Sequence, residues 1–273
     1  MIKIDSAEAL AQTPSSPLRS PKTFLLLLML VLFFRSSPLG LSVRPRHQMI
    51  IWNVGQGAWS TEVDEQACLH FDAGGERSAL PKLPEYCQGH ENVLFLSHAD
   101  QDHIGFAARL AQTFPTCVES LPVMLSPRQK RNLSPIPICP TPQSLTKTWP
   151  LKIFDGTNPH AKRMMPNDTS RVWISHNEWF VIPGDSPKRE EKIWREKIPH
   201  PSRIRILILG HHGSRTSTAE KTLLAMPNLK MAVSSARQVR FGHPHAEVVA
   251  LLKKHHIALI RTEFWGHLHF LEE

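Results

Sequence analysis

The sequence predicts an α/β fold. Short apolar runs, which read as buried strands, alternate with segments whose apolar residues recur at helical spacing. Several of these runs are followed directly by His and Asp residues, which are side chains that bind metals. Ligand sites in α/β proteins form at the carboxyl ends of strands, so these side chains are expected to converge. A chain of 273 residues with 41% hydrophobic residues can bury the core that such a fold needs.

Residues 1–47 are expected to form an N-terminal leader or membrane anchor ahead of one domain over residues 48–273. Residues 24–34 are uninterrupted apolar residues and follow Arg19 and Lys22. This run is shorter than the roughly 20 residues that a spanning helix needs, so it fits the apolar part of a secretory signal. An uncleaved anchor formed by residues 24–34, with membrane association, is the alternative. Both interpretations place the domain outside the cytoplasm, in the periplasm or on the extracellular face.

The first part of the domain combines strands with one clear helix. Three apolar runs are predicted strands: 49–54, 67–71 and 93–96. The first of them runs into the turn Gly55-Gln56-Gly57, where glycine lets the backbone approach closely. Residues 103–114 have the spacing of an amphipathic helix. The Pro-rich segment 115–150 is expected to be irregular, with a short strand at 123–125.

The second part of the domain alternates strands and helices more regularly. Six further strands are predicted, over 171–175, 179–182, 205–209, 231–234, 258–261 and 264–270. The first two of these form a hairpin. The highly charged residues 187–197 are expected to form a solvated helix, and two more helices are expected at 217–225 and up to Lys254.

The most informative segment lies between the strand at 93–96 and the helix at 103–114. Here His98, Asp100, Asp102 and His103 place imidazole and carboxylate groups on a tight strand-to-helix turn. This combination suits zinc, manganese or iron, and the carboxylates favour the harder ions. A polar loop that only caps the helix is the alternative. The alternating spacing of the ligands behind a buried strand makes that alternative the weaker one.

Charge and cysteine content bound the function loosely. Residues 1–47 carry six basic and two acidic residues, so half of the net charge of +8 lies in the leader. The mildly basic remainder is compatible with a nucleic-acid partner but does not require one. Cys68, Cys87, Cys117 and Cys139 contain no C-x-x-C pair, so a zinc knuckle is not indicated. One or two disulfides, in any of three connectivities, and buried free thiols all stay open.

Six motifs in a fixed order resemble the metallo-β-lactamase superfamily. They are Asn53-Val54-Gly55-Gln56-Gly57, Phe71-Asp72-Ala73-Gly74, Ser97 to Gly105, Pro183-Gly184-Asp185, Gly210 to Ser217 and Gly242-His243-Pro244-His245. The chain looks most like the extracytoplasmic hydrolase domain of ComEC-type DNA-uptake proteins. The resemblance covers about residues 49–270. It implies an αββα sandwich, with a metal site at the strand ends, for the domain at 48–273.

The resemblance also implies a site with two divalent ions, zinc or manganese, one of them weakly held. His98 and Asp100 would hold one ion. The ligands of the other would be Asp102, His103 and one histidine of the pair His211 and His212. His211 is preferred because it comes first after the strand, and His212 is then the alternative ligand. Asp185 would bridge both ions, and Asp72 would orient the ligands from behind.

Catalytic and substrate-binding roles follow from the same resemblance. Asp102, Asp185 and His243 would be the catalytic residues, with His243 facing the substrate phosphate. Ser214, Arg215 and His245 would bind the substrate. Arg237 and Arg240 also flank the His motifs and could bind phosphate, although solvated charge is the better interpretation of any single arginine. Among the tryptophans, only Trp59 and Trp265 are candidates for base stacking.

The chain departs from the family pattern at several positions. Asn53 and Ala58 stand where the family usually has acids, and Phe106 stands where it has glycine. Asn167 lies where the wider superfamily has a further histidine. His160 and His176 could substitute for that histidine, but both are more typical of surface residues. The multi-span channel of ComEC-type proteins has no counterpart in this sequence, so DNA transport is not an expected activity.

The expected function is metal-dependent hydrolysis of a phosphodiester in nucleic acid, as a phosphodiesterase or nuclease. Hydrolysis of another ester or amide, such as a phosphocholine-type ester or a lactam, is the second interpretation, because one fold hosts many chemistries. Asp100 in place of a second histidine disfavours a lactam. The third interpretation is a non-catalytic module that binds DNA or a partner, which Asn53, Ala58 and Phe106 favour.

Overall fold

The computed structural model describes residues 2–4, 47–140, 149–158 and 164–272. The expected leader run at 24–34 lies outside these residues, so the leader, its membrane association and the domain boundary at residue 48 stay predictions. Residues Ile2–Ile4 are strand β1, which pairs antiparallel with Leu268–Phe270 near the other end of the chain. Among the described residues, every helix is too short or too polar to span a membrane.

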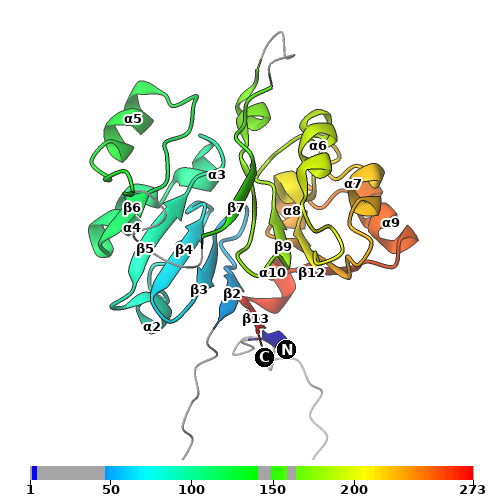
Figure 1. The fold of residues 1–273 in the computed structure, drawn as a ribbon, viewed down its shortest axis with the longest axis horizontal. Coiled ribbons are helices and arrows are strands. Elements are labelled where there is room, and N and C mark those ends of the chain that lie inside the picture. Colours follow the sequence, from blue (N-terminus) through cyan, green and yellow to red (C-terminus); the bar gives the residue numbers. More distant parts are fainter. Residues whose placement is uncertain (1, 5–46, 141–148, 159–163, 273) are drawn as a thin grey trace, which may run out of the picture. The chain divides into compact units, whose positions relative to one another are not determined.

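Two mixed β-sheets form the centre of the fold (Figure 1). The first sheet has the order β1-β13-β2-β3-β4-β5-β6, and the second has the order β12-β11-β10-β9-β8-β7. The strands of the first sheet are β1 (Ile2–Ile4), β2 (Gln48–Ile51), β3 (Ser60–Val63), β4 (Ala67–Phe71), β5 (Glu91–Phe95), β6 (Thr116–Val118) and β13 (Leu268–Leu271). Those of the second are β7 (Leu151–Phe154), β8 (Val172–Ile174), β9 (Phe180–Ile182), β10 (Ile206–Ile208), β11 (Met231–Ser234) and β12 (Ala258–Arg261).

The central strands of each sheet are buried on both faces, which explains why most of them read as continuous apolar runs. On β2, Met49 and Ile51 join the core between the two sheets, whereas Ile50 between them joins the core under the helices. On β9, Phe180 and Ile182 belong to the same inter-sheet core. The alternation follows from the two-residue period of a strand. The result is a layered αββα sandwich, as the sequence predicts.

Helices cover the outer face of each sheet (Figure 1). Those of the first half are α2 (Pro84–Cys87), α3 (Gln101–Ile104), α4 (Ala107–Thr113) and α5 (Pro127–Leu133). Those of the second half are α6 (Lys188–Trp194), α7 (Glu220–Leu224), α8 (Gln238–Phe241), α9 (Ala246–Lys254) and α10 (Thr262–Trp265). Single turns of 3-10 helix are η3 (Pro166–Thr169), η4 (Arg195–Lys197) and η5 (Gly210–Gly213).

Several local expectations need correction. The strand predicted at 123–125 is wrong, because Val123 and Met124 lie in a turn. The helix α5 follows it and begins with a capping box between Ser126 and Gln129, a signal readable in the sequence. The helix expected at 103–114 is two helices, α3 and α4, because the Phe106 backbone N–H donates to Ala73.

Two further expectations hold only in part. The charged segment 187–197 does contain the helix α6, but Glu190 and Glu191 are buried. Glu191 accepts hydrogen bonds from the backbone N–H groups of Thr218 and Ala219, at 2.5 and 2.7 Å. The segment 264–270 begins as helix α10 and becomes strand β13 only at Leu268.

Two disulfides tie the first half of the domain together. Cys68 on β4 bonds Cys87 on α2, and Cys117 on β6 bonds Cys139. The sequence separations are 19 and 22 residues. Loops of that size make each bond worth about 3 kcal/mol by the chain-entropy estimate. The structure thereby selects one of the three connectivities and excludes free thiols.

A carboxylate buried between the two sheets makes stability depend on pH. Glu62 on β3 accepts from the backbone N–H of His176 at 3.2 Å, and its Oε1 lies 3.4 Å from Nε2 of His47. Burial raises the pKa of Glu62 to about 8, although the His176 hydrogen bond opposes this. The folded chain therefore keeps a proton that the unfolded chain releases near its ordinary pKa of 4.5.

We expect the free energy of unfolding of the parent to fall as pH rises from about 5 to about 8, by at most roughly 1.4 kcal/mol per pH unit. Glu62→Gln should flatten this dependence, because the amide has no proton to lose. Denaturant unfolding at several pH values measures the effect. The exposed Glu91→Gln is the matched control and should follow the parent. Equal slopes for Glu62→Gln and the parent would refute the assignment.

Candidate metal centre

The candidate ligands converge because they follow the ends of neighbouring strands. Asp72 follows β4, residues 98–103 follow β5, Asp185 follows β9, and the pair His211 and His212 follows β10. β4 and β5 are parallel neighbours in the first sheet, and β9 and β10 are parallel neighbours in the second. Parallel neighbours end on the same edge, so each pair delivers its loops to one place. The two edges face each other across the centre.

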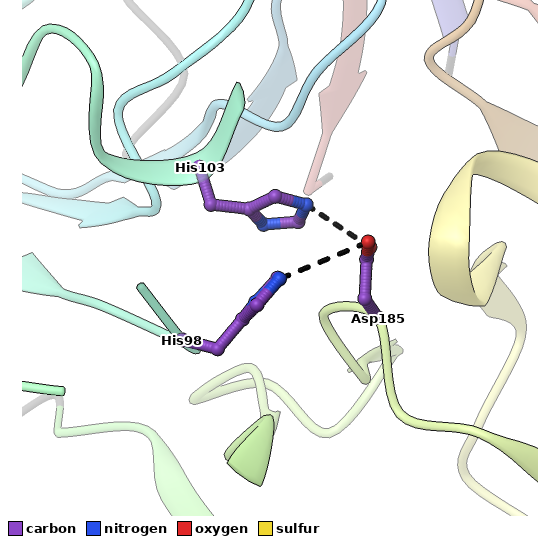
Figure 2. Close-up of side chains that lie close together, drawn as sticks. All are labelled: His98, His103 and Asp185. Carbon is purple, nitrogen blue, oxygen red and sulfur yellow. Dashed lines mark ion pairs between the residues drawn. The ribbon is translucent and has the colours of Figure 1, made fainter. Parts of the chain in front are cut away.

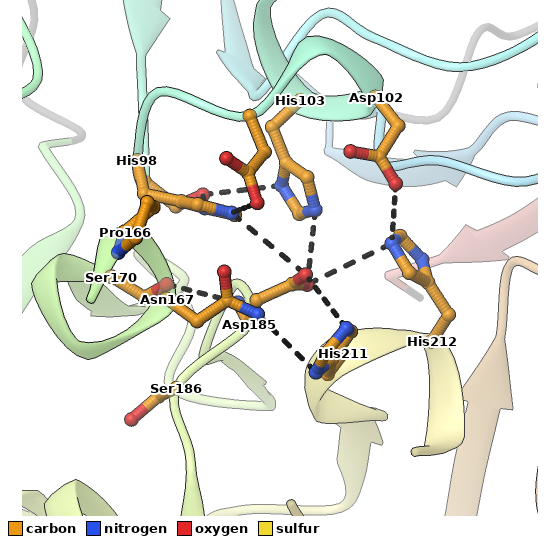
Figure 3. Close-up of polar contacts among 12 residues, drawn as sticks. His98, Asp102, His103, Pro166, Asn167, Ser170, Asp185, Ser186, His211 and His212 are labelled. Atoms are coloured by element: carbon orange, nitrogen blue, oxygen red, sulfur yellow. Dashed lines mark hydrogen bonds and ion pairs between the residues drawn. The ribbon is translucent and has the colours of Figure 1, made fainter. Parts of the chain in front are cut away.

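The Asp185 carboxylate lies in the middle of four imidazoles. Its Oδ1 is 3.0 Å from Nε2 of His103 and 3.7 Å from Nε2 of His212. Its Oδ2 is 3.8 Å from Nε2 of His98 and 3.6 Å from Nε2 of His211. Figure 2 shows His98 and His103 pointing at this carboxylate, and Figure 3 shows all four rings around it. Each carboxylate oxygen therefore faces its own pair of histidines.

One further carboxylate joins each side of the centre. Oδ2 of Asp100 lies 3.4 Å from Nε2 of His98, and Oδ2 of Asp102 lies 3.1 Å from Nε2 of His212. Two groups have ligand atoms close enough together to hold one metal ion: His98 with His103 and Asp185, and Asp102 with His103 and His212. The second group contains His212 in the place for which the sequence analysis preferred His211. His211 faces the other oxygen of Asp185.

The Nδ1 atom of every one of these histidines has its own partner. Nδ1 of His103 contacts Asp72 Oδ2 at 2.7 Å, and Nδ1 of His212 contacts the Ser235 carbonyl at 3.1 Å. Nδ1 of His98 contacts Ser97 Oγ at 3.0 Å. Nδ1 of His211 contacts Asn167 Nδ2 at 3.3 Å and Thr216 Oγ1 at 3.2 Å. The acceptors behind His98, His103 and His212 hold each ring with its Nε2 facing Asp185, which is how metal-binding histidines are usually oriented, and Thr216 Oγ1 can accept from Nδ1 of His211 in the same way.

The backbone is held in uncommon conformations at the same positions. Asp72, His211 and His212 have φ values of 57°, 49° and 57°. This left-handed region costs a residue with a Cβ roughly 1–2 kcal/mol and is concentrated at functional sites. Gly184, just before Asp185, has φ +55°, and a Cβ there would lie 2.6 Å from Cβ of Ser97. Glycine is therefore required where the two sheets bring their loops together.

The pKa values of Asp185 and Asp102 are lowered in spite of the burial of these two carboxylates. Burial favours the neutral form of Asp185, but the charges of His103 and His212 hold its pKa well below the ordinary value. Burial likewise opposes ionisation of Asp102, yet the His212 hydrogen bond and the charge of His103 lower its pKa to about 2. The pKa of His103 is raised well above its ordinary value, because Asp185 and Asp72 outweigh the effect of burial. Positive charge therefore stabilises the ionised carboxylates of the centre, and a divalent cation can supply that charge.

His243 lies at the edge of the centre and is held by the glycine-rich turn after β2. Its ring is 5.8 Å from that of His211, and its Nδ1 is 3.2 Å from Nε2 of Gln56. Gln56 Oε1 accepts from the backbone N–H of Arg237 at 3.4 Å, so the amide nitrogen of Gln56 is the group that faces His243. Burial and the neighbouring His212 lower the pKa of His243 to about 4. At neutral pH the ring is therefore neutral, with its proton on Nε2.

The other residues expected to bind substrate differ in their burial and in their distance from the metal centre. Ser214 is buried, and its Oγ accepts from Thr216. Nδ1 of His245 accepts a hydrogen bond from the backbone N–H of Arg215 at 3.2 Å. Arg215 therefore lies beside the loop that carries both His243 and His245. Trp59 is fully buried in the core and cannot stack on a base, which corrects that expectation. His176 lies near Glu62, and His160 is outside the described residues.

Arg237 and Arg240 are not free cations. Their guanidinium groups contact the Glu76 carboxylate at 2.8 and 2.6 Å. Glu76 also accepts from the backbone N–H of Gln56 at 3.1 Å. The two arginines therefore tie helix α8 to the Gly55-Gln56-Gly57 turn. Arg240 keeps much of its side chain at the surface nevertheless, with 63% exposed.

Sequence reasoning missed the small polar residues that support the ligands. Ser97 donates through its backbone N–H and Oγ to Asp72, both at 2.8 Å, and Ser170 accepts from the Asp185 backbone N–H at 3.2 Å. Asn167, noted only as the place of a missing histidine, contacts His211 as described above. Ser and Asn are common in loops, so only the motif Asn167-Asp168-Thr169-Ser170 could have pointed to these contacts.

A small cavity lies behind the centre. It has a volume of about 30 Å³, and His103, Asp185 and His212 line it on one side. Ala58 also lines it, at the position where the family motif usually has an acid. Ala58 therefore lies beside the ligands, and the departure at this position removes none of the groups around Asp185.

Comparisons with known proteins agree with this picture. The chain is 26% identical over 239 residues to ComE operon protein 3 of Bacillus subtilis, and 26% identical over 240 residues to Recombination protein 2 of Haemophilus influenzae. Each match covers 82% of this chain but only 30% and 28% of the relative, so the chain spans less than a third of these proteins. No family model matches the chain.

A solved structure shares the fold. The metallo hydrolase Igni18 of the archaeon Ignicoccus hospitalis superposes with a TM-score of 0.50, at 10% sequence identity, over 83% of this chain and 100% of that one. The expected resemblance to ComEC-type proteins is confirmed over most of the chain, and the domain has a metallo-β-lactamase-like fold. Its fold is that of metal-dependent hydrolases, and its His and Asp clusters suit divalent metal ions.

Asp72 should control metal affinity without binding the ion. Asp72→Asn removes the charge behind His103, while asparagine accepts the left-handed backbone that this position requires. We expect zinc affinity at pH 7, measured by competition with a chelator, to fall by about 10- to 100-fold. The exposed Asp155→Asn is the control and should bind zinc like the parent. Unchanged affinity in Asp72→Asn would show that the Asp72–His103 contact does not support the metal centre.

Proposed function

We propose that this chain is a metal-dependent phosphodiesterase acting on nucleic acid through two divalent ions. The observation that carries the proposal is the arrangement around Asp185, whose two oxygens face separate pairs of imidazole Nε2 atoms. A carboxylate so placed can bridge two cations. Two ions a few Å apart suit displacement at phosphorus, where both the attacking and the leaving oxygen need stabilisation.

The residues present fit metal ions. Nε2 of His98, Nε2 of His103 and Oδ1 of Asp185 are buried polar atoms that make no hydrogen bond of regular geometry, and the last two approach each other at 3.0 Å as an ion pair. Leaving such atoms unsatisfied is costly, because they have lost their contacts with water. Their side chains are also the ones oriented from behind by Ser97 and Asp72. Imidazole nitrogens and carboxylate oxygens together form the ligand chemistry of zinc and manganese.

The two ligand sets share Asp185. One ion would be held by His98, Asp100 and His211, on the Oδ2 side. The other would be held by Asp102, His103 and His212, on the Oδ1 side. The first set is the more open, because the side chains of Asp100 and His211 are 41% and 30% exposed, and its ion is expected to be the weaker. When bound, such ions supply an acidified water molecule and neutralise charge on the phosphate oxygens.

The remaining chemistry belongs to the chain's own side chains. His243 keeps its proton on Nε2 because Gln56 donates to Nδ1, so it presents a hydrogen-bond donor at the mouth of the centre. A neutral N–H donor there can bind a phosphate oxygen of the substrate. His245 lies on the same loop as His243, and Arg215 of the loop 211–217 contacts His245. These two residues are the proposed further contacts with the substrate.

Nucleic acid is the proposed substrate because of the ComEC-type resemblance and the excess of basic residues. The same resemblance supports a place in DNA uptake, outside the cytoplasm. The apolar run at 24–34, which follows Arg19 and Lys22, is the proposed signal or anchor. Hydrolysis of another ester or amide has no observation in its favour. The departures from the family pattern at Asn53, Ala58 and Phe106 favour a non-catalytic module, and assay of the metal-loaded chain separates the two.

The purified chain should hydrolyse bis(p-nitrophenyl) phosphate and DNA or RNA when supplied with manganese or zinc. Asp102→Asn should lower kcat/KM on the order of 10³-fold, because it removes a ligand and a charge worth several kcal/mol. The matched control is Asp155→Asn, which changes an exposed carboxylate and should retain activity. Equal rates for Asp102→Asn and the parent, or no hydrolysis by a chain shown to bind metal, would contradict the proposal and favour the binding module.

A further inference from the structure

Helices α8 and α10 expose apolar side chains to an unusual degree. Val239 and Phe241 on α8 are 98% and 40% exposed, and Phe264 and Trp265 on α10 are 64% and 50% exposed. Such a group of large apolar residues at a surface indicates an interaction site. We call these four residues, together with Arg240 and Arg261, the α8–α10 face.

The two helices lie side by side. The backbone N–H of Gln238, at the start of α8, donates to Glu263 of α10 at 3.2 Å. The side chain of Gln238 in turn accepts from the guanidinium of Arg261, just before α10. These contacts join the helices by their polar groups, and the aromatic side chains keep their exposure. Figure 1 shows α8 and α10 close to each other in the second half of the domain.

Each side of the face combines an arginine with an aromatic ring. The guanidinium of Arg240 lies 5.1 Å from the ring centre of Phe241, and that of Arg261 lies 5.5 Å from the ring centre of Phe264. These are cation–π distances. Flat guanidinium and aromatic groups side by side are the elements on which nucleic-acid bases stack, and the same guanidinium groups attract phosphate.

The face is connected to the metal centre. Gly242 ends α8, and the next residue is His243, which faces the centre. Arg240 also contacts Glu76, whose other oxygen accepts from the backbone N–H of Gln56, the residue that holds His243. The end of α8 therefore lies one residue from the side chain that faces the metal centre.

We propose that the α8–α10 face binds single-stranded nucleic acid by stacking unpaired bases and leads that strand to the metal centre. The inference rests on the proposed function for its substrate. Unpaired bases have free faces for Phe264 and Trp265, whereas the bases of a duplex are already stacked on one another. Arg261, beside Phe264, supplies complementary charge for the backbone, whereas Arg240 shares its charge with Glu76. A membrane surface would also accept Val239 and Trp265, and the experiment tests that occupant.

Binding is measured with the full chain in EDTA, so that no cleavage occurs, by fluorescence anisotropy of a labelled 20-nucleotide oligothymidylate and of a duplex of equal length. The parent should bind the single strand more tightly than the duplex. Phe264→Ala/Trp265→Ala should weaken single-strand binding by about 10-fold or more, because one stacked base is worth roughly 1–3 kcal/mol. Both residues are exposed, so the fold should not change. Leu224→Ala, at a 60% exposed apolar residue on α7, is the matched control and should bind like the parent.

A second variant and two further readouts make the outcomes distinct. Arg261→Lys keeps the charge but loses the flat group, and it should also weaken single-strand binding. Hydrolysis of bis(p-nitrophenyl) phosphate should be unchanged in all these variants, because this small ester does not need the face. If the parent does not hydrolyse this ester, the proposed function is wrong. The binding measurements in EDTA would still show whether the α8–α10 face binds single strands. Binding to vesicles of phosphatidylcholine and phosphatidylglycerol is the other readout. The inference would be overturned if both variants bound the single strand like the parent, or if they lost only their binding to these vesicles.

Discussion

One buried carboxylate governs this structure. Asp185 is surrounded by the Nε2 atoms of four histidines from two loops, and each of its oxygens faces a separate pair. An ionised group in so buried a place is stable only if positive charge is held beside it. The strand ends, the polar contacts behind each ring and the unusual backbone angles all hold that charge in position. The layered fold is what allows loops from both sheets to reach one point.

This arrangement is costly, and the rest of the molecule offsets the cost. Three left-handed residues with side chains, Asp72, His211 and His212, store strain at the centre. The inter-sheet core and the two outer cores under the helices hold the strands that carry them. Glu191 on α6 adds to this support, because it fixes the backbone at Thr218 and Ala219 just beyond the histidine loop. The packed sheets thus stabilise the fold, and the backbone strain lies in the loops that carry the candidate ligands.

The fold was largely predictable because most strands are buried on both faces. The strands at 67–71, 231–234 and 258–261 have the predicted bounds. Strand β3 escaped prediction because Ser60, Thr61 and Glu62 are polar, and their burial depends on partners distant in sequence, such as Trp52 and His176. The choice between His211 and His212 depends on two successive left-handed residues, which no periodicity reveals. Trp59 was misjudged for a similar reason, because only the packed fold shows that its side chain is in the core.

In the proposed site, Asp185 is shared by two sets of metal ligands. A crystal structure of the chain grown with zinc or manganese, with the ions located by anomalous scattering, tests this arrangement most directly. We predict two peaks that share Asp185, one against His98, Asp100 and His211 and the other against Asp102, His103 and His212. A single peak that leaves one set empty at saturating metal, or an ion that does not touch Asp185, would contradict the account.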